Sequence, residues 1–243
     1  MKIIYIYHSG FAIVNQDTTV IIDYFRDSGA KRNEGIVHEH LLNNSGKLYV
    51  LSSHAHPDHF NPEILTWKEK RRDIQYIFST DILESGKAGK KDAIYLKKFD
   101  VYEDETIKVK ALGSTDIGIS FLITLEDKTF FHAGDLNNWH WKEESTPEEI
   151  KEAENYFLTE LNDLKRETEY IDVVMFPVDS RLGKDYMLGA QQFVDNIKTG
   201  LFIPMHFGEA YEKVATFNDY AESKGAHYVI IDHKAQVINV KED

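Results

Sequence analysis

The chain has 243 residues, of which 42% are hydrophobic and 28% are charged, so it can bury a sizeable core and is unlike disordered or fibrous proteins. It has no cysteine, which excludes disulfides, thiolate zinc sites and cysteine nucleophiles. Lys and Arg total 28 against 41 Asp and Glu, and the resulting net charge of −13 disfavours nucleic acid as a substrate or partner.

The N-terminal stretch MKIIYIYHSGFAIV is apolar, but it has one lysine, is interrupted by His8 and lacks an A-x-A cleavage site, so it does not match a signal peptide. No apolar run approaches the ~18 residues that a membrane-spanning helix needs. We therefore expect a cytoplasmic protein that acts on a small-molecule substrate and does not bind membranes. The sequence leaves the oligomeric state open, a homo-oligomer included.

The first half of the chain contains short segments rich in β-branched and aromatic residues and bounded by Gly, Asn, Asp or Ser, which is the pattern of β-strands. We predict such strands at residues 2–7, 12–15, 19–25, 47–53, 74–79, 93–98, 106–112, 119–126 and 128–134.

The second half alternates between helix and strand patterns. A charged helix is predicted at 146–169, because Thr146-Pro147-Glu148-Glu149 is a typical helix start. Further strands are predicted at 171–178, 201–205 and 227–232, and further helices at 187–197 and 210–225. No repeat or linker divides the chain, so we predict an α/β fold with a single domain spanning residues 1–243.

Polar residues of catalytic type recur just beyond these strands. In α/β proteins the ends of neighbouring strands lie close together, so residues from distant parts of the chain can meet there. The residues in these positions are Asp23, His54, Asp135, Asp179 and His206.

The segment SSHAHPDHF, residues 52–60, places three histidines and one aspartate within six positions. In an extended chain His54 and His56 share one face, and a turn at Pro57 would swing Asp58 and His59 away from them. Two ligand pairs suit two adjacent cations, and imidazole with carboxylate suits zinc, manganese or iron. The alternative is a group of exposed loop histidines, which is how we interpret the H-x-H at His38 and His40.

The segment SSHAHPDH resembles the H-x-H-x-D-H signature of the metallo-β-lactamase fold superfamily. YHSGFAI, VIIDYF, FFHAGD and IPMHFG resemble further segments of that superfamily in the expected order. The nearest resemblance is to its metal-dependent hydrolase branch, similar to ascorbate-phosphate-lactonase-like proteins. The resemblance implies a four-layered αβ/βα sandwich of two mixed β-sheets flanked by helices, with metals at one edge between the sheets.

The resemblance also implies a ligand set. His54 and His56 would hold a first metal, Asp135 would bridge both metals, and the second metal would be held by Asp58, His59 and His206. The chain departs from many relatives after Gly113, where Ser114 replaces a histidine ligand of the first metal. Asp116, His132 or water could complete that site, and His132 could equally make a supporting hydrogen bond.

Other residues near these motifs are candidates for supporting roles. Asp23 and Asp179 would each orient a ligand imidazole, since liganded histidines usually donate their other N–H to a carboxylate or carbonyl. His8 could face the substrate or support a ligand. Trp139 could line the ligand pocket or pack against a helix, and His140 could support a ligand or face the substrate. Arg181 could bind an anionic substrate or remain solvated.

The expected function is a metal-dependent hydrolase with one or two divalent ions, with zinc favoured and manganese or iron open. A cation lowers the pKa of bound water to ~7, and the resulting hydroxide would attack a lactone, ester or phosphodiester of a small, preferably anionic, metabolite. Asp58 or Asp135 could relay the proton, and His206 or His8 could face the substrate.

Three alternatives stay open. The set His54, His56 and Asp135 is also the pattern of mononuclear iron oxidoreductases. A non-catalytic protein that binds or senses a metal would need the same ligands. A nuclease similar to ribonuclease Z is disfavoured by the acidic charge balance.

Overall fold

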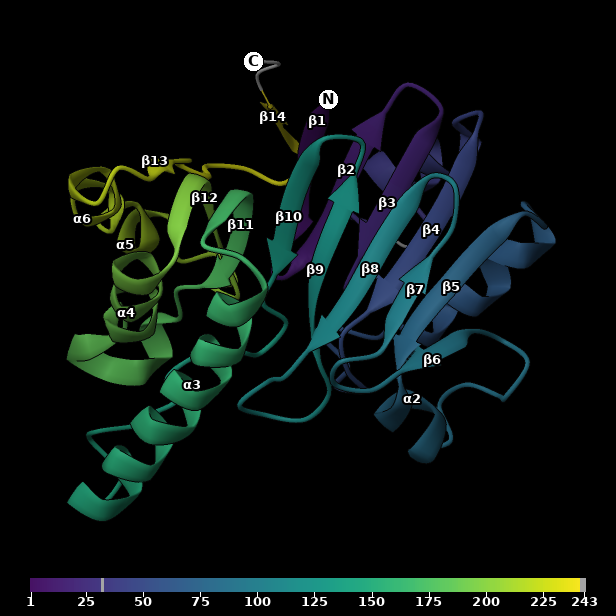
Figure 1. Ribbon diagram of the computed structural model, residues 1–243. Coiled ribbons are helices and arrows are strands. Elements are labelled where there is room, and N and C mark those ends of the chain that lie inside the picture. The colour runs from purple at the N-terminus through teal and green to yellow at the C-terminus, as the bar shows by residue number, and fades with distance from the viewer. Residues whose placement is uncertain (32, 241–243) are drawn as a thin grey trace. The chain divides into compact units, whose positions relative to one another are not determined.

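The computed structural model describes residues 1–31 and 33–240. Their contacts group into two compact units, Met1–Leu96 with Asp232–Asp243, and Lys97–Ile231. Each unit is built around one seven-stranded sheet, and Figure 1 shows both sheets with their helices. The predicted fold class, α/β with two mixed sheets flanked by helices, is confirmed. No helix in the described ranges is both long enough and apolar enough to cross a membrane.

The sheet of the first unit has the order β14-β1-β2-β3-β4-β5-β6. Its pairings are antiparallel from β14 to β3 and parallel from β3 to β6. The strands are β1 (Lys2–Tyr7), β2 (Gly10–Asn15), β3 (Thr18–Ile22), β4 (Lys47–Ser52), β5 (Ile74–Ser79), β6 (Ile94–Leu96) and β14 (Gln236–Asn239).

Short helices cover one face of this sheet. Alternate strand residues such as Leu48 and Val50 are buried against Ile64 and Trp67, in one cluster that also includes residues of the other short helices. This packing fixes the helices that carry several polar residues discussed below. The helices are α1 (Ile36–Glu39), α2 (Thr80–Glu84) and the 3-10 helices η1 (Leu41–Asn43) and η2 (Pro62–Glu69).

The sheet of the second unit has the order β13-β12-β11-β10-β9-β8-β7, parallel from β13 to β10 and antiparallel from β10 to β7. The strands are β7 (Val101–Glu103), β8 (Ile107–Leu112), β9 (Ser120–Leu125), β10 (Lys128–His132), β11 (Tyr170–Pro177), β12 (Lys198–Met205) and β13 (His227–Tyr228). The helices are α3 (Pro147–Glu167), η3 (Ser180–Asp185), α4 (Leu188–Asn196), α5 (Tyr211–Ala215) and α6 (Asn218–Ser223).

Helix α3 begins where the sequence predicts. The Thr146 side chain accepts a hydrogen bond from the Glu149 N–H, and the Glu149 carboxylate accepts one from the Thr146 N–H, which forms a capping box. The helix is amphipathic, with Phe157, Leu161 and Leu164 buried. The Phe157 ring lies 6.1 Å from that of Phe176 in β11, so this face anchors the helix to the sheet.

Two predicted elements are shorter than expected. The helix predicted at 210–225 is broken between α5 and α6, because the Phe217 N–H bonds to the Val214 carbonyl three residues back and tightens the turn. The strand predicted at 227–232 is limited to β13, at residues 227–228. The short strands β7 and β14 and the helices α1 and α2 were not predicted, since each has only three to five residues.

Replacing Phe157 by alanine should lower the free energy of unfolding by about 3–5 kcal/mol, because a buried aromatic ring is lost and a cavity remains. Urea unfolding followed by circular dichroism measures this change. Tyr156→Ala is the matched control, since the Tyr156 side chain on the same helix is 49% exposed. Equal effects of the two substitutions would contradict the proposed anchoring of α3.

Candidate metal site

The ends of four strands in the first unit point to one edge of its sheet. Strands β3, β4 and β5 are parallel, and β1 runs in the same direction as β3, two antiparallel steps away. His8 follows β1, Asp23 follows β3 and His54 follows β4, so the predicted clustering at strand ends is present within this unit. Asp81, which follows β5 in the same way, was not predicted although the segment IFSTD carries the same signal.

The imidazoles of His54 and His56 lie together. His54 Nε2 is 3.1 Å from His56 Nδ1, and the two rings are nearly perpendicular, at 81°. Metal–nitrogen bonds of 2.0–2.1 Å in tetrahedral geometry separate two ligand nitrogens by roughly 3.3 Å. The spacing of this pair therefore fits two ligands of one ion.

A second group contains His8, Asp58 and His59. His8 Nε2 is 3.3 Å and His59 Nε2 is 3.9 Å from Asp58 Oδ2, and the candidate ligand atoms all lie within 4.8 Å of one another. The sequence predicted Asp58 and His59 as ligands, and His8 as a residue that faces the substrate or supports a ligand. His8 has a φ of 59°, a left-handed conformation uncommon for a non-glycine residue and often found at functional sites.

The predicted turn at Pro57 is present, but it does not separate the two groups widely. His59 and Phe60 N–H groups both donate to the His56 carbonyl, at 3.0 and 2.9 Å, which closes the turn. The His54 and His59 rings nevertheless lie 4.1 Å apart. Their Nδ1 atoms share the Ser53 hydroxyl, at 2.9 and 3.4 Å, and this shared contact keeps the rings together.

Asp23 contacts the Nδ1 side of the His59 imidazole. Its fully buried carboxylate accepts hydrogen bonds from the Ser53 N–H at 2.7 Å and the Ser53 hydroxyl at 2.6 Å, and it lies 2.7 Å from His59 Nδ1. An imidazole that donates Nδ1–H to a carboxylate presents the lone pair of Nε2 to a cation. This is the contact expected of a residue that orients a ligand.

The second unit repeats this arrangement with different residues. Strands β10, β11 and β12 are parallel, and Asp135, Asp179 and His206 lie just beyond their ends. His206 Nδ1 lies 3.0 Å from Asp179 Oδ2, and His206 Nε2 lies 3.4 Å from Asp135 Oδ1. The Asp179 carboxylate can therefore orient the imidazole, while the Asp135 carboxylate lies beside Nε2, where both could bind one ion.

Arg181 makes several hydrogen bonds to Asp179. Its Nε and Nη2 lie 2.9 and 2.5 Å from Asp179 Oδ2, although most of the Arg181 side chain is exposed. Burial alone would raise the pKa of Asp179, but hydrogen bonds from His206 and Arg181 outweigh it and hold this pKa well below its usual range. Asp179 therefore stays ionised, which secures its bond to His206.

The two aromatic candidates after Asp135 differ in role. Trp139 Nε1–H donates to the Asp135 carbonyl at 2.8 Å, and the Trp139 ring lies edge-on to His206 at 5.6 Å. His140 is buried, with Nε2 3.2 Å from the Asp185 carbonyl, and burial lowers its pKa. Trp139 thus contacts the predicted ligands, whereas His140 fixes the local chain.

Ser114, Asp116 and His132 were the residues considered for the first metal site beyond its two histidines. Ser114 is buried, and its hydroxyl accepts from the N–H of Asp116, which is exposed. His132 Nδ1 accepts from the Gly134 N–H at 3.2 Å, so it supports the turn that leads to Asp135. Within the described ranges, neither Asp116 nor His132 belongs to a group of three or more potential ligands.

The interpretation of His38 as an exposed loop histidine is wrong, whereas His40 is exposed as expected. The buried His38 ring lies between two carboxylates, with Nδ1 2.7 Å from Asp27 and Nε2 2.7 Å from Glu63. The contact between His38 and Glu63 could not be predicted from the sequence, because the two residues are distant in the chain. His38 therefore ties the segment after β3 to η2.

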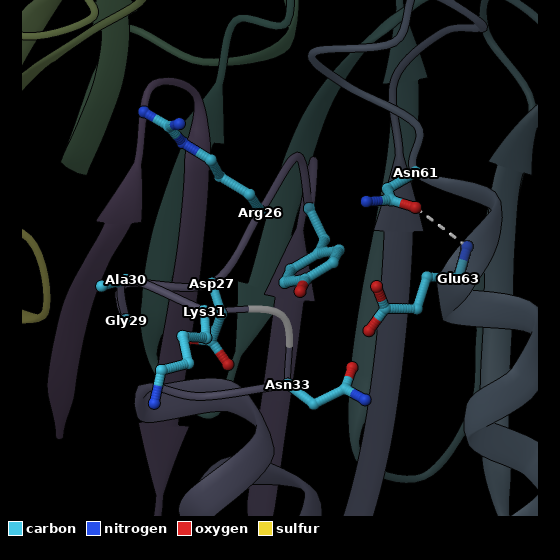
Figure 2. A pocket seen from close by; sticks show the side chains of 9 residues that line it. Arg26, Asp27, Gly29, Ala30, Lys31, Asn33, Asn61 and Glu63 are labelled. Atoms are coloured by element: carbon cyan, nitrogen blue, oxygen red, sulfur yellow. Dashed lines mark hydrogen bonds between the residues drawn. The ribbon is translucent and has the colours of Figure 1, made fainter.

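A recess of about 330 Å³ lies beside this tie, and Figure 2 shows the side chains around it. Its walls come from the segments that follow Asp23 and His59, and the Asn61 side chain joins them by donating to the Phe25 carbonyl at 2.8 Å. The recess is lined by Tyr24, Arg26, Asp27, Gly29, Ala30, Lys31, Asn33, Asn61 and Glu63.

Replacing His38 by leucine should lower the free energy of unfolding by about 3–5 kcal/mol, because the buried Asp27 carboxylate and the partly buried Glu63 carboxylate lose their shared partner. Chemical denaturation measures the effect, with His40→Leu as the exposed control, expected to change stability by less than about 0.5 kcal/mol. A neutral effect of His38→Leu would show that Asp27 and Glu63 do not depend on this histidine.

The donor set fits a divalent cation. Three pairs of candidate ligand atoms, His54–His56, His8–Asp58 and His206–Asp135, lie 3.1 to 3.4 Å apart, near the spacing of ligands around one ion. Two of the imidazoles have a buried carboxylate at Nδ1, the usual support of a metal-bound histidine. Nitrogen and oxygen donors without thiolate match zinc, manganese or iron.

Comparisons with known proteins agree with this chemistry. A family model described as the beta-lactamase superfamily domain matches residues 2–152, more than half of the chain. The chain therefore belongs to the beta-lactamase superfamily, as the resemblance of SSHAHPDH indicated.

Individual relatives span nearly the whole chain. A protein of Nanoarchaeum equitans named a UPF0173 metal-dependent hydrolase is 24% identical over 98% of this chain and 99% of its own length. The structure of Igni18, described as a metallo hydrolase of Ignicoccus hospitalis, has a TM-score of 0.68 at 15% identity, covering 98% of this chain and 97% of Igni18. CmlA, a diiron β-hydroxylase of Streptomyces venezuelae, has a TM-score of 0.67 at 14% identity, covering 98% of this chain but 53% of CmlA.

Proposed function

We propose that this protein is a metal-dependent hydrolase that holds one or two divalent ions, with zinc favoured. The observation that carries the proposal is the paired imidazole and carboxylate arrangement in each unit, Asp23 with His59 and Asp179 with His206. The name of the Nanoarchaeum equitans relative supports the reaction class. The proposed ligands are His54, His56, Asp58, His59, Asp135 and His206.

Divalent ions in such a site supply an activated water at neutral pH and polarise the scissile bond. The protein's own residues would then orient the ligands and move a proton. Asp58 Oδ2 lies 3.3 Å from His8 Nε2, and its side chain is 32% exposed, so it can accept a proton and pass it to His8 or solvent. Trp139 beside His206 would exclude water from one side of the substrate.

We propose a small metabolite with a lactone, ester or phosphodiester group as the substrate. The net charge of −13 argues against a polyanion such as RNA. An anionic metabolite would need a local cation, and the exposed part of Arg181 is the candidate, held in place by Asp179. The protein is proposed to act in the cytoplasm without a membrane or nucleic-acid partner.

Replacing His59 or His206 by alanine should remove bound metal and reduce hydrolysis to the background rate. Elemental analysis and assays with lactone, ester and phosphodiester substrates measure the two effects. His227→Ala is the control, because its side chain is 75% exposed and lies outside the proposed site. Full activity in either variant would refute the ligand assignment.

Protein purified without added metal should contain zinc or manganese and should not consume oxygen during turnover. Metal analysis combined with an oxygen electrode tests this expectation. Iron together with oxygen consumption would instead favour the alternative of a mononuclear iron oxidoreductase that uses His54, His56 and Asp135. One tightly held metal without any turnover would favour a sensing role.

A further inference from the structure

The peptide groups on both sides of Ala55 connect the two histidines of the H-x-H segment. The Ala55 N–H donates to Asp81 Oδ2 at 2.7 Å, and the Ala55 carbonyl accepts a hydrogen bond from Lys87 Nζ. The N–H belongs to the peptide that begins at His54, and the carbonyl belongs to the peptide that ends at His56. Each peptide is thus held by one charged side chain, which restricts how the two imidazoles can move relative to each other.

This contact is anchored to the core of the first unit. Asp81 lies in α2 directly after β5, and its neighbour Ile82 is fully buried in the core cluster. The Lys87 N–H bonds to the Ile82 carbonyl at 3.1 Å, and Ala88 is buried in the same cluster. Both charged side chains are therefore presented from a fixed backbone.

Among the described residues, the Asp81 carboxylate accepts a hydrogen bond only from the H-x-H segment. The donor is the Ala55 N–H, while Asp81 Oδ1 is buried without a hydrogen-bond partner in the described ranges. A partly buried carboxylate with one unpartnered oxygen carries a desolvation cost that a single hydrogen bond offsets only in part. That one bond goes to the residue between two proposed ligands, which supports a role in positioning them.

We infer that Asp81 and Lys87 are positioning residues that set the spacing of His54 and His56 for a divalent cation. The inference rests on the proposed function. A preset nitrogen–nitrogen distance of 3.1 Å lowers the ordering cost of binding and raises affinity.

Calorimetric titration of metal-free protein with Zn²⁺ or Co²⁺ tests the inference without an activity assay. His54→Ala identifies the equivalent of metal that depends on the H-x-H pair. Asp81→Ala should lower the affinity for that equivalent of metal by about 10–100-fold and leave the affinity for any other equivalent unchanged. Asp81→Asn, which retains an oxygen acceptor for Ala55, should recover most of the lost affinity.

Lys87→Met should also lower the affinity for the same equivalent of metal. This variant tests the inference if Asp81→Ala does not fold. Lys90→Met is the matched control, since Lys90 is an exposed lysine three residues further along. Wild-type affinity in folded Asp81→Ala and Lys87→Met would overturn the inference and leave the proposed hydrolase intact. A wild-type protein that binds no metal at all would instead overturn the proposed function, and the inference with it.

Discussion

The hydrogen bond between a buried carboxylate and the Nδ1 atom of an imidazole organises the candidate site in both units. Asp23 makes this contact with His59 and Asp179 makes it with His206, at 2.7 and 3.0 Å. A free imidazole has two tautomers and rotates about its side-chain bonds, whereas a carboxylate at Nδ1 fixes both. The remaining nitrogen is then held in a form and direction suited to a cation.

The sheets explain why these carboxylates are available. In each unit the pairings are parallel through one half of the sheet and antiparallel through the other. The parallel strands end at a common edge, so each delivers a polar residue to the same place. Asp23 and His54 arrive on β3 and β4, while Asp179 and His206 arrive on β11 and β12.

Much of this arrangement could be predicted from the sequence, because it follows local patterns. Strand ends followed by Asp or His indicated Asp23 and Asp179, and the H-x-H-x-D-H motif indicated the ligand-rich loop. Contacts that need tertiary structure were missed. His38 contacts Glu63 across 25 positions and Asp81 accepts a hydrogen bond from Ala55 across 26, and neither pairing produces a periodic pattern in the sequence. The proximity of His54 and His59 was also missed, because their shared Ser53 hydroxyl shortens a separation that the turn alone suggested.

The central claim is that His59 and His206, each oriented by a buried carboxylate, bind metal through Nε2. Crystals grown with zinc and measured at the zinc absorption edge test this claim most directly. We predict anomalous density about 2.0–2.1 Å from Nε2 of each ring, with Nδ1 of His59 still bonded to Asp23 and Nδ1 of His206 still bonded to Asp179. A peak at other residues, or coordination through Nδ1 with the carboxylates displaced, would contradict it.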